Sequence, residues 1–201
     1  MQIQYIALER EYASGGQEIG ERVAKALGIP CYGREILEKT AAQYGMTAEY
    51  LEYLEENYTG SLLHSIYLMG QQMQSSLASS DAVTMAEAEV IRSLALDGPA
   101  VFVGRCAGEA LAGRDNVLRV FIHASPDFRK ERAARCYGIP ADQVEHTLHS
   151  FDTRRRNFYR STTGHKWSDP NNYHLMLNSS ELGLDTCVSL LESAYRQLSG
   201  R

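Results

Sequence analysis

The chain has 201 residues, 44% of them hydrophobic, and a formal net charge of −5. It is long and apolar enough to bury the core of a single domain, 1–201. The negative charge argues against general binding to nucleic acid polymers, which attract an excess of Lys and Arg. No apolar run approaches the roughly 18 residues of a membrane span, and no basic leader precedes the first apolar run. We therefore expect a cytoplasmic protein without a membrane partner.

Four cysteines lie far apart in the sequence, at positions 31, 106, 136 and 187. None forms a C-x-x-C pair, the spacing typical of zinc ligands and of redox-active pairs. In a cytoplasmic protein this pattern favours free thiols over disulfides. We expect neither a disulfide nor a metal site.

The chain begins with an apolar run, a turn that contains glycines, and an amphipathic stretch. Residues 3–8 have the composition of a buried strand, and apolar residues recur at helical spacing over 19–27. The turn between them contains Ser14, Gly15 and Gly16. A helix that begins after such a turn offers free N–H groups and the positive end of its dipole, which suit a phosphate. Two glycines in this place are equally typical of an ordinary tight turn.

The turn lacks much of the standard phosphate loop, G-x-x-x-x-G-K-[ST]. We align its last glycine with Gly16. Gln17 then replaces the lysine, Glu18 the hydroxyl residue or its neighbour, and Glu11 the first glycine. Gln17 donates hydrogen bonds but carries no charge, so the cations that bind phosphates must come from elsewhere in the chain.

Four more apolar runs have the length of strands, and amphipathic stretches separate them. These runs occupy residues 29–32, 100–103, 117–122 and 174–177. The run at 100–103 is continuously apolar, as expected of a central strand covered on both faces. The alternation predicts an α/β fold of three layers, with helices on both faces of a five-stranded parallel sheet.

Residues 44–80 differ in composition from the rest of the chain. They begin with several glutamates and continue as a helical stretch rich in Leu, Met and Tyr. A Met and Tyr stripe is more typical of a core or a dimer surface than of a cofactor pocket. We interpret the segment as a helical insertion that packs on the core or on a second copy in a homodimer.

Two arginines follow predicted strands directly, Arg34 after the second strand and Arg105 after the third. The carboxyl ends of parallel strands share one edge of the sheet, where α/β proteins bind ligands. Both arginines are therefore candidates for binding an anion. For Arg34, an ion pair with Glu35 or Glu38 on a solvated helix explains the residue at least as well.

The densest positive charge lies in a long predicted helix at 141–161. This helix contains Asp152 and a run of arginines that includes Arg154 and Arg155. A solvated basic face is the usual explanation of such a run. The loop that follows contains glycine and is expected to be mobile, so the whole region 141–168 is a candidate basic lid over phosphates.

Five stretches of the chain, taken in order, resemble the cytidylate kinase-like family of P-loop phosphotransferases. They read EREYASGGQEIG, IPCYGREIL, VFVGRCAGEAL, DTRRRNFY and TGHKWSDPNNYHLMLNSSELG, at residues 9–20, 29–37, 101–111, 152–159 and 163–183. The resemblance covers nearly the whole chain. Five ordered motifs are far more specific than any one of them.

The resemblance implies a nucleoside monophosphate kinase fold, with ATP and Mg²⁺ as the phosphoryl donor and a nucleotide as the acceptor. It places the donor phosphates on Ser14, Gly15, Gly16 and Gln17.

The resemblance also implies roles for the charged residues. Arg34 and Arg105 would lie at the acceptor side. Arg154 and Arg155 would be lid arginines that neutralise the transferring phosphoryl group, and Asp152 would orient the lid.

The chain departs from the family pattern at positions where a charge is expected near phosphates or magnesium. The departures are Gln17 for arginine, Gly33 and His174 for aspartate, Thr153 for lysine, and Cys106 for the aspartate of classical cytidylate kinases. Two hypotheses therefore stay open. The first is an active ATP-dependent kinase of nucleoside monophosphates with a degenerate phosphate loop. The second is a catalytically inactive relative that binds nucleotide or a protein partner.

Overall fold

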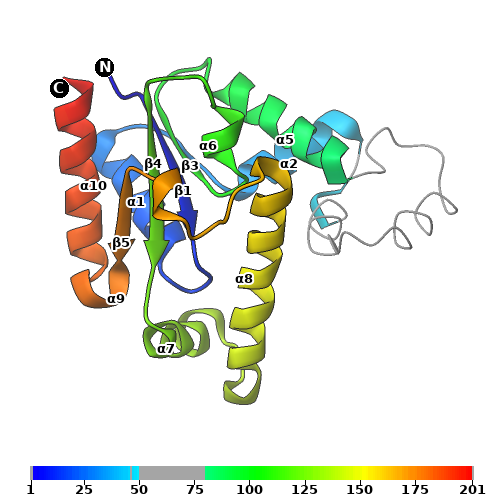
Figure 1. The fold of residues 1–201 in the computed structure, drawn as a ribbon, viewed down its shortest axis with the longest axis vertical. Helices are drawn as coiled ribbons and strands as arrows, with labels where there is room; N and C mark the ends of the chain where they lie inside the picture. The colour runs from blue at the N-terminus through cyan, green and yellow to red at the C-terminus, as the bar shows by residue number, and fades with distance from the viewer. Residues whose placement is uncertain (1, 46, 50–79, 201) are drawn as a thin grey trace, which may run out of the picture.

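The computed structural model describes residues 2–45, 47–49 and 80–200. Its strands form one sheet in the order β2-β3-β1-β4-β5, and every neighbouring pair is parallel. The strands are β1 (Tyr5–Arg10), β2 (Cys31–Tyr32), β3 (Ala100–Val103), β4 (Val117–His123) and β5 (Leu175–Asn178). The prediction of a five-stranded parallel sheet is confirmed. All strands therefore end at one edge of the sheet (Figure 1).

Helices cover both faces of this sheet, as the three-layer prediction requires (Figure 1). Helices α1 (Gly16–Leu27) and α10 (Leu184–Ser199) pack on one face. Helices α2 (Arg34–Tyr44), α5 (Ser80–Leu94) and α6 (Ala107–Ala110) contribute to the core on the other face.

Two more helices extend beyond the carboxyl edge of the sheet. They are α7 (Pro126–Tyr137), toward which the arrowheads of the strands point, and the long α8 (Ala141–Thr163), which runs beside the sheet and extends past this edge (Figure 1). Both helices share a small core with the turn between β1 and α1. The short elements η1 (Pro170–Asn172) and α9 (Ser179–Leu182) flank β5.

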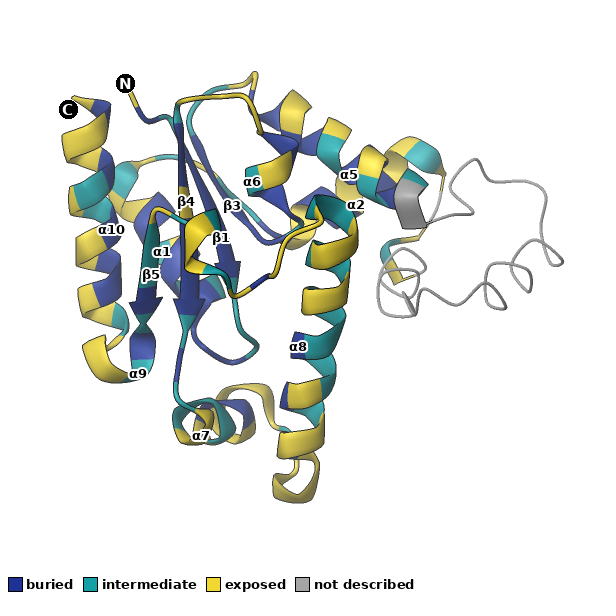
Figure 2. Cartoon of the chain, in the orientation of Figure 1, coloured by how far each residue is buried: buried dark blue, intermediate teal, exposed yellow. Residues whose placement is uncertain are grey.

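Strand β1 lies in the middle of the sheet and is buried along most of its length (Figure 2). Ile6 and Leu8 belong to the core with α1 and α10, whereas Tyr5 and Ala7 belong to the core with α5 and α6. The strand continues to Arg10, two residues past its predicted end, because its backbone stays paired with β4. The apolar pattern ends before the strand does.

The other differences from prediction are small. The sequence analysis did not identify α6, a single turn after β3, and α8 continues two residues past its predicted end. Most of the proposed helical insertion at 44–80, and with it the proposed dimer surface, lies outside the described residues. All four cysteines are free thiols, as expected. None of the helices in the described part of the chain is both long and apolar enough to cross a bilayer.

Candidate functional site

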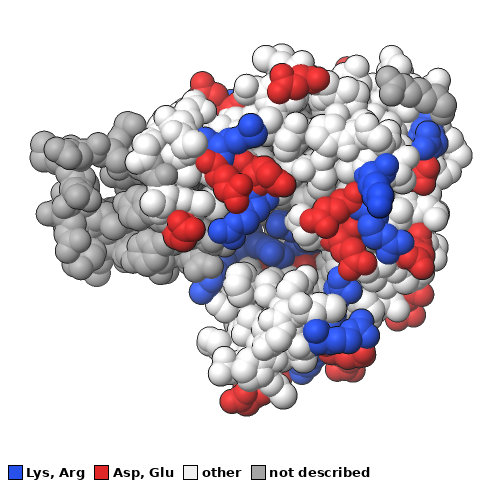
Figure 3. Space-filling model, turned by 180° about the vertical axis from the view of Figure 1, so that it is seen from behind, with Lys and Arg blue, Asp and Glu red and all other residues white. Residues whose placement is uncertain are grey.

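A cavity of about 400 Å³ opens where β1 and β3 end and α8 passes over them. Five of its lining residues are arginines, and Glu9 is the one carboxylate among the described residues that line it. The lining residues are Glu9, Arg10, Gln17, Gly33, Arg34, Arg105, Cys106, Phe151, Arg154, Arg155, Phe158 and Tyr159. Figure 3 shows Lys and Arg side chains inside the hollow on this side of the molecule. The cavity is therefore suited to an anion.

The structure brings together the four arginines that the sequence analysis proposed. Arg34 and Arg105 reach the cavity from the turns after β2 and β3, and Arg154 and Arg155 reach it from α8. Residues from three separate parts of the chain thus meet at one edge of the sheet, as the topology of a parallel sheet requires.

The sequence analysis did not identify Arg10, the fifth arginine of the cavity. Its side chain runs closely past two glycines. A Cβ atom at Gly16 would lie 2.4 Å from Arg10 Cβ, and a Cβ at Gly104 would lie 1.9 Å from Arg10 Nη1. Burial lowers the pKa of Arg10 below its usual value. Both glycines provide the space through which Arg10 reaches the cavity.

Arg155 lies beside Arg10. Its Nη1 donates a hydrogen bond to the backbone carbonyl of Arg10 at 3.0 Å, and its guanidinium lies 5.5 Å from the centre of the Tyr12 ring. Burial, and next the charge of Arg10, lower the pKa of Arg155 to about 9. The positive charge of this part of the cavity is therefore poorly compensated by the protein, and a bound anion would stabilise it.

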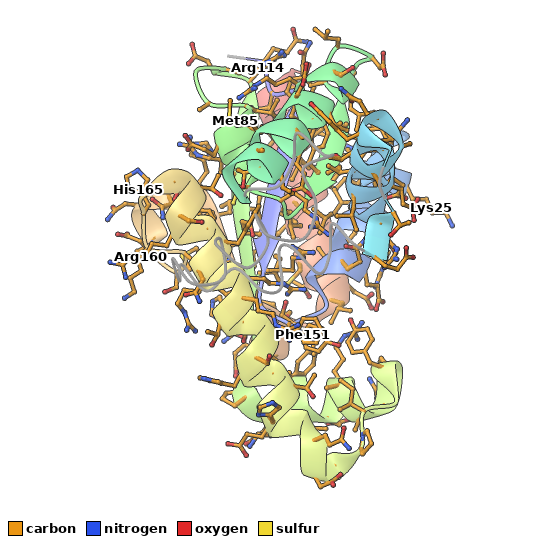
Figure 4. The ribbon with its side chains drawn as sticks, turned by 90° about the vertical axis from the view of Figure 1, so that its right-hand side faces the viewer. Lys25, Met85, Arg114, Phe151, Arg160 and His165 are labelled. Atoms are coloured by element: carbon orange, nitrogen blue, oxygen red, sulfur yellow. The ribbon has the colours of Figure 1, made fainter. Side chains whose placement is uncertain are left out.

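An aromatic stack holds the turn before α1 against α8. The rings of Tyr12 and Phe151 are stacked, with centres 4.3 Å apart and planes inclined by 10°. Figure 4 shows Phe151 on α8 at the level of the turn that precedes α1. Arg154 lies over the Phe151 ring of this stack, with its guanidinium 5.2 Å from the ring centre. The stack positions Arg154 and Arg155 relative to the turn.

Arg105 lies in the left-handed backbone region, with a φ of 59°. Its Nη1 lies 3.3 Å from Oε1 of Glu87, a residue of α5 that is 1% exposed. Burial raises the pKa of Glu87 to about 8. The sequence analysis did not identify Glu87, because nothing in its helical surroundings indicates that it faces Arg105. Arg34 is more exposed, and its Nε lies 3.4 Å from Glu38 Oε1, which is the ion pair considered as the alternative.

The glycine turn leads directly into α1. Gly15 has a φ of +83°, and α1 begins at Gly16. Ser14 is fully buried, and its hydroxyl donates to the carbonyl of Glu11 at 2.9 Å. The carbonyl of Ser14 in turn accepts a hydrogen bond from the Ser179 hydroxyl at 2.6 Å. Ser14, Gly15 and Gly16 are not among the residues that line the cavity. Gln17 alone of the four predicted phosphate-binding residues lines it.

Gln17 and Gly33, two of the departures from the family pattern, are neighbours in space. A Cβ at Gly33 would lie 3.1 Å from Gln17 Nε2, and that nitrogen donates to Glu21 at 2.8 Å. The family pattern would thus place an arginine and an aspartate next to each other here, and this chain has neither charge.

Glu11 of the turn and Glu18 of α1 both interact with arginines of α7. Glu11 accepts from the backbone N–H of Ala124 at 3.1 Å and lies 3.6 Å from Arg129 Nε. Glu18 accepts from Arg132 Nη2 at 2.5 Å. Their negative charges are therefore partly neutralised by α7.

Asp152 connects the same elements and is not among the residues that line the cavity. It is 6% exposed, accepts from the backbone N–H of Tyr12 at 2.8 Å, and forms an ion pair with Arg129. In this position Asp152 anchors α8 to the turn and to α7.

The loop after α8 is attached to the sheet, which corrects the expectation of a mobile segment. Trp167 is 3% exposed, and its Nε1 donates to Glu9 at 3.2 Å. Its ring meets Phe121 of β4 edge to face, with centres 5.2 Å apart. A buried indole and its hydrogen bond fix this loop beside the cavity.

The fold is similar to the folds of solved small-molecule kinases. Shikimate kinase from Acinetobacter baumannii, solved in complex with shikimate, has a TM-score of 0.52 at 13% identity, over 97% of this chain and 94% of that one. A gluconokinase from Sinorhizobium meliloti has a TM-score of 0.55 at 16% identity, over 100% of this chain and 96% of that one. At these identities the likeness concerns the fold alone.

The chain belongs to the cytidylate kinase-like family, whose sequence profile matches residues 5–181. An uncharacterized protein from Eubacterium ventriosum has a TM-score of 0.71 at 21% identity, over 96% of this chain and 98% of that one. No curated protein sequence matches the chain.

Proposed function

We propose that this protein is an ATP-dependent phosphotransferase whose acceptor is a nucleoside monophosphate of the cytidylate type. The observation that carries the proposal is the convergence of five arginines on one cavity at the carboxyl edge of the sheet. Phosphoryl transfer needs positioning and neutralisation of negative charge more than covalent chemistry. An arginine-rich cavity beside a helix that begins after a glycine turn supplies both.

In this proposal the donor phosphates lie at the start of α1, and Arg154 and Arg155 neutralise the transferring group. Arg34 and Arg105 hold the phosphate of the acceptor. An acceptor phosphate oxygen forms a bond to the γ-phosphorus of ATP while the bond from that phosphorus to the bridging oxygen breaks, and its electron pair leaves with ADP. The attacking phosphate has a second pKa of about 6, so it is already ionised at neutral pH and needs no general base.

Magnesium would enter with the donor nucleotide. Mg²⁺ in kinases typically keeps several waters and binds through substrate phosphates and one or two carboxylates. The described residues contain no cluster of three or more His, Cys, Asp or Glu able to hold a metal ion, and Glu9 is the described carboxylate of the cavity. This set fits an ion carried mainly by phosphates and water.

The test measures ADP release from Mg-ATP with CMP, UMP, AMP and GMP as acceptors. We expect release with at least one pyrimidine monophosphate, and an Arg105→Met variant should raise the KM for that acceptor by about tenfold or more. Arg156→Met, which removes an exposed arginine of α8 outside the cavity, is the matched control. Absence of both ADP release and ATP binding would refute the proposal.

A second candidate function is nucleotide binding without transfer. It is favoured by the uncharged Gln17–Gly33 contact, where the family pattern has opposite charges. Losing one charge-assisted contact to a transferring phosphoryl group costs about 2–4 kcal/mol of transition-state stabilisation. ATP binding in the absence of ADP release with all four acceptors would select this alternative.

A further inference from the structure

We propose that Arg10 is the positive side chain that binds the donor phosphates, the role that a lysine has in the standard phosphate loop. Gln17, at the position of that lysine, does not have this role. This inference rests on the proposed function, because it assigns a role in binding the donor. It concerns a residue at the end of β1, outside the glycine turn and outside the lid.

The location of Arg10 is the first support. Arg10 is the last residue of β1, and its side chain passes both Gly16, the first residue of α1, and Gly104, the residue after β3. At Gly104 the near approach involves Nη1 itself, so the guanidinium lies at the carboxyl end of β3. A cation between the start of α1 and the end of β3 is placed to meet a phosphate bound at the helix start.

The surroundings of the Arg10 guanidinium are the second support. Within the described part of the chain its side chain forms no ion pair and no hydrogen bond. The charge of Glu9 acts on Arg10, but the Glu9 carboxylate accepts a hydrogen bond from Trp167. Arg155, whose pKa the charge of Arg10 helps to lower, adds positive charge nearby. A partly buried cation among other cations is unfavourable without an anion, so an anion bound here gains a charge-assisted contact at little competing cost.

The contacts of Gln17 are the third support. Its side-chain nitrogen is engaged by Glu21 of the same helix, and its amide packs against the backbone of Gly33. Gln17 thus connects α1 to the turn after β2. It brings no net charge to phosphates, whereas Arg10 does.

The experiment is isothermal titration of the full chain with two probes, Mg-ATP and inorganic tripolyphosphate, which carries phosphates without a nucleoside. Arg10→Met should weaken binding of both probes by about tenfold or more, the loss expected for one charge-assisted contact. Arg10→Lys, which keeps the charge, should recover most of the affinity. Gln17→Met should weaken binding by no more than about threefold.

Gly104→Ala gives a second measurement that leaves Arg10 in the chain. The added methyl group occupies the position of the guanidinium, so binding of tripolyphosphate should fall in the wild-type background. In the Arg10→Met background the same change should have no further effect on affinity. If Arg10→Met does not fold, as judged by circular dichroism, Gly104→Ala in the wild-type background still tests the inference, because it displaces the guanidinium without removing Arg10.

The outcomes separate the two proposals. If the wild type binds neither probe, the proposed function fails and the role of Arg10 fails with it. If the wild type binds Mg-ATP and Arg10→Met binds equally well, or if Gln17→Met loses as much affinity as Arg10→Met, the inference on Arg10 is wrong while the proposed function stands.

Discussion

Asp152 provides the sharpest test of how α8 is held against the turn before α1. Its carboxylate accepts from the Tyr12 N–H and pairs with Arg129, and the two side chains of the pair are 9% and 12% exposed. Asp152→Asn keeps an acceptor for Tyr12 but removes the charge. Leaving one partner of a buried ion pair unpaired costs about 3–5 kcal/mol. Because Glu11 still lies 3.6 Å from Arg129, we expect a smaller loss of unfolding free energy, about 2–3 kcal/mol.

The assay is denaturant unfolding at pH 7, monitored by circular dichroism. The ion pair between Lys130 and Glu145 joins the same two helices at 3.2 Å but is exposed, with side-chain exposures of 41% and 83%. Glu145→Gln is therefore a matched control, and it should cost less than about 0.5 kcal/mol. The double variant Asp152→Asn with Arg129→Met should lose less than the sum of the single variants, by about 1 kcal/mol or more.

Equal losses for Asp152→Asn and Glu145→Gln would refute this reasoning. So would additive losses in the double variant, since additivity would mean that Asp152 and Arg129 do not stabilise one another.

Three further predictions concern residues around the cavity. Burial raises the pKa of Glu87 to about 8, so the folded state keeps a proton that the unfolded state loses near pH 4.5. The unfolding free energy should therefore fall as pH rises from about 5 to 8. Glu87→Gln should lack this fall in unfolding experiments across that range. Gln17→Arg and Gly33→Asp introduce opposite charges on neighbouring residues. The unfolding free energy of the double variant should therefore exceed the value expected from adding the two single changes by about 0.5–1 kcal/mol, measured by denaturant unfolding; an additive result argues against their contact. Trp167→Leu removes a buried ring and the donor to Glu9, and should lower the unfolding free energy by about 3 kcal/mol in the same denaturant assay.

The sequence alone was sufficient for the sheet and for most helices. Short apolar runs and helical periodicity are local signals, and residues such as Val103 and Ile19 follow them because burial of apolar area drives folding wherever they occur. Ends of elements were less predictable. Arg10 was placed outside its strand, because pairing with β4 rather than hydrophobicity extends β1 that far.

The sequence also identified four of the five arginines that meet at the cavity. Arg34 and Arg105 were proposed because they follow strands, and Arg154 and Arg155 because they form an arginine run on a long helix. Only the tertiary structure decided what surrounds them. The space for Arg10 is provided by Gly104, 94 residues further along the chain, and Glu87 faces Arg105 from a helix whose local pattern gives no sign of it. Asp152 turned out to join three elements, because hydrogen bonds and ion pairs between distant segments depend on packing that no local pattern encodes.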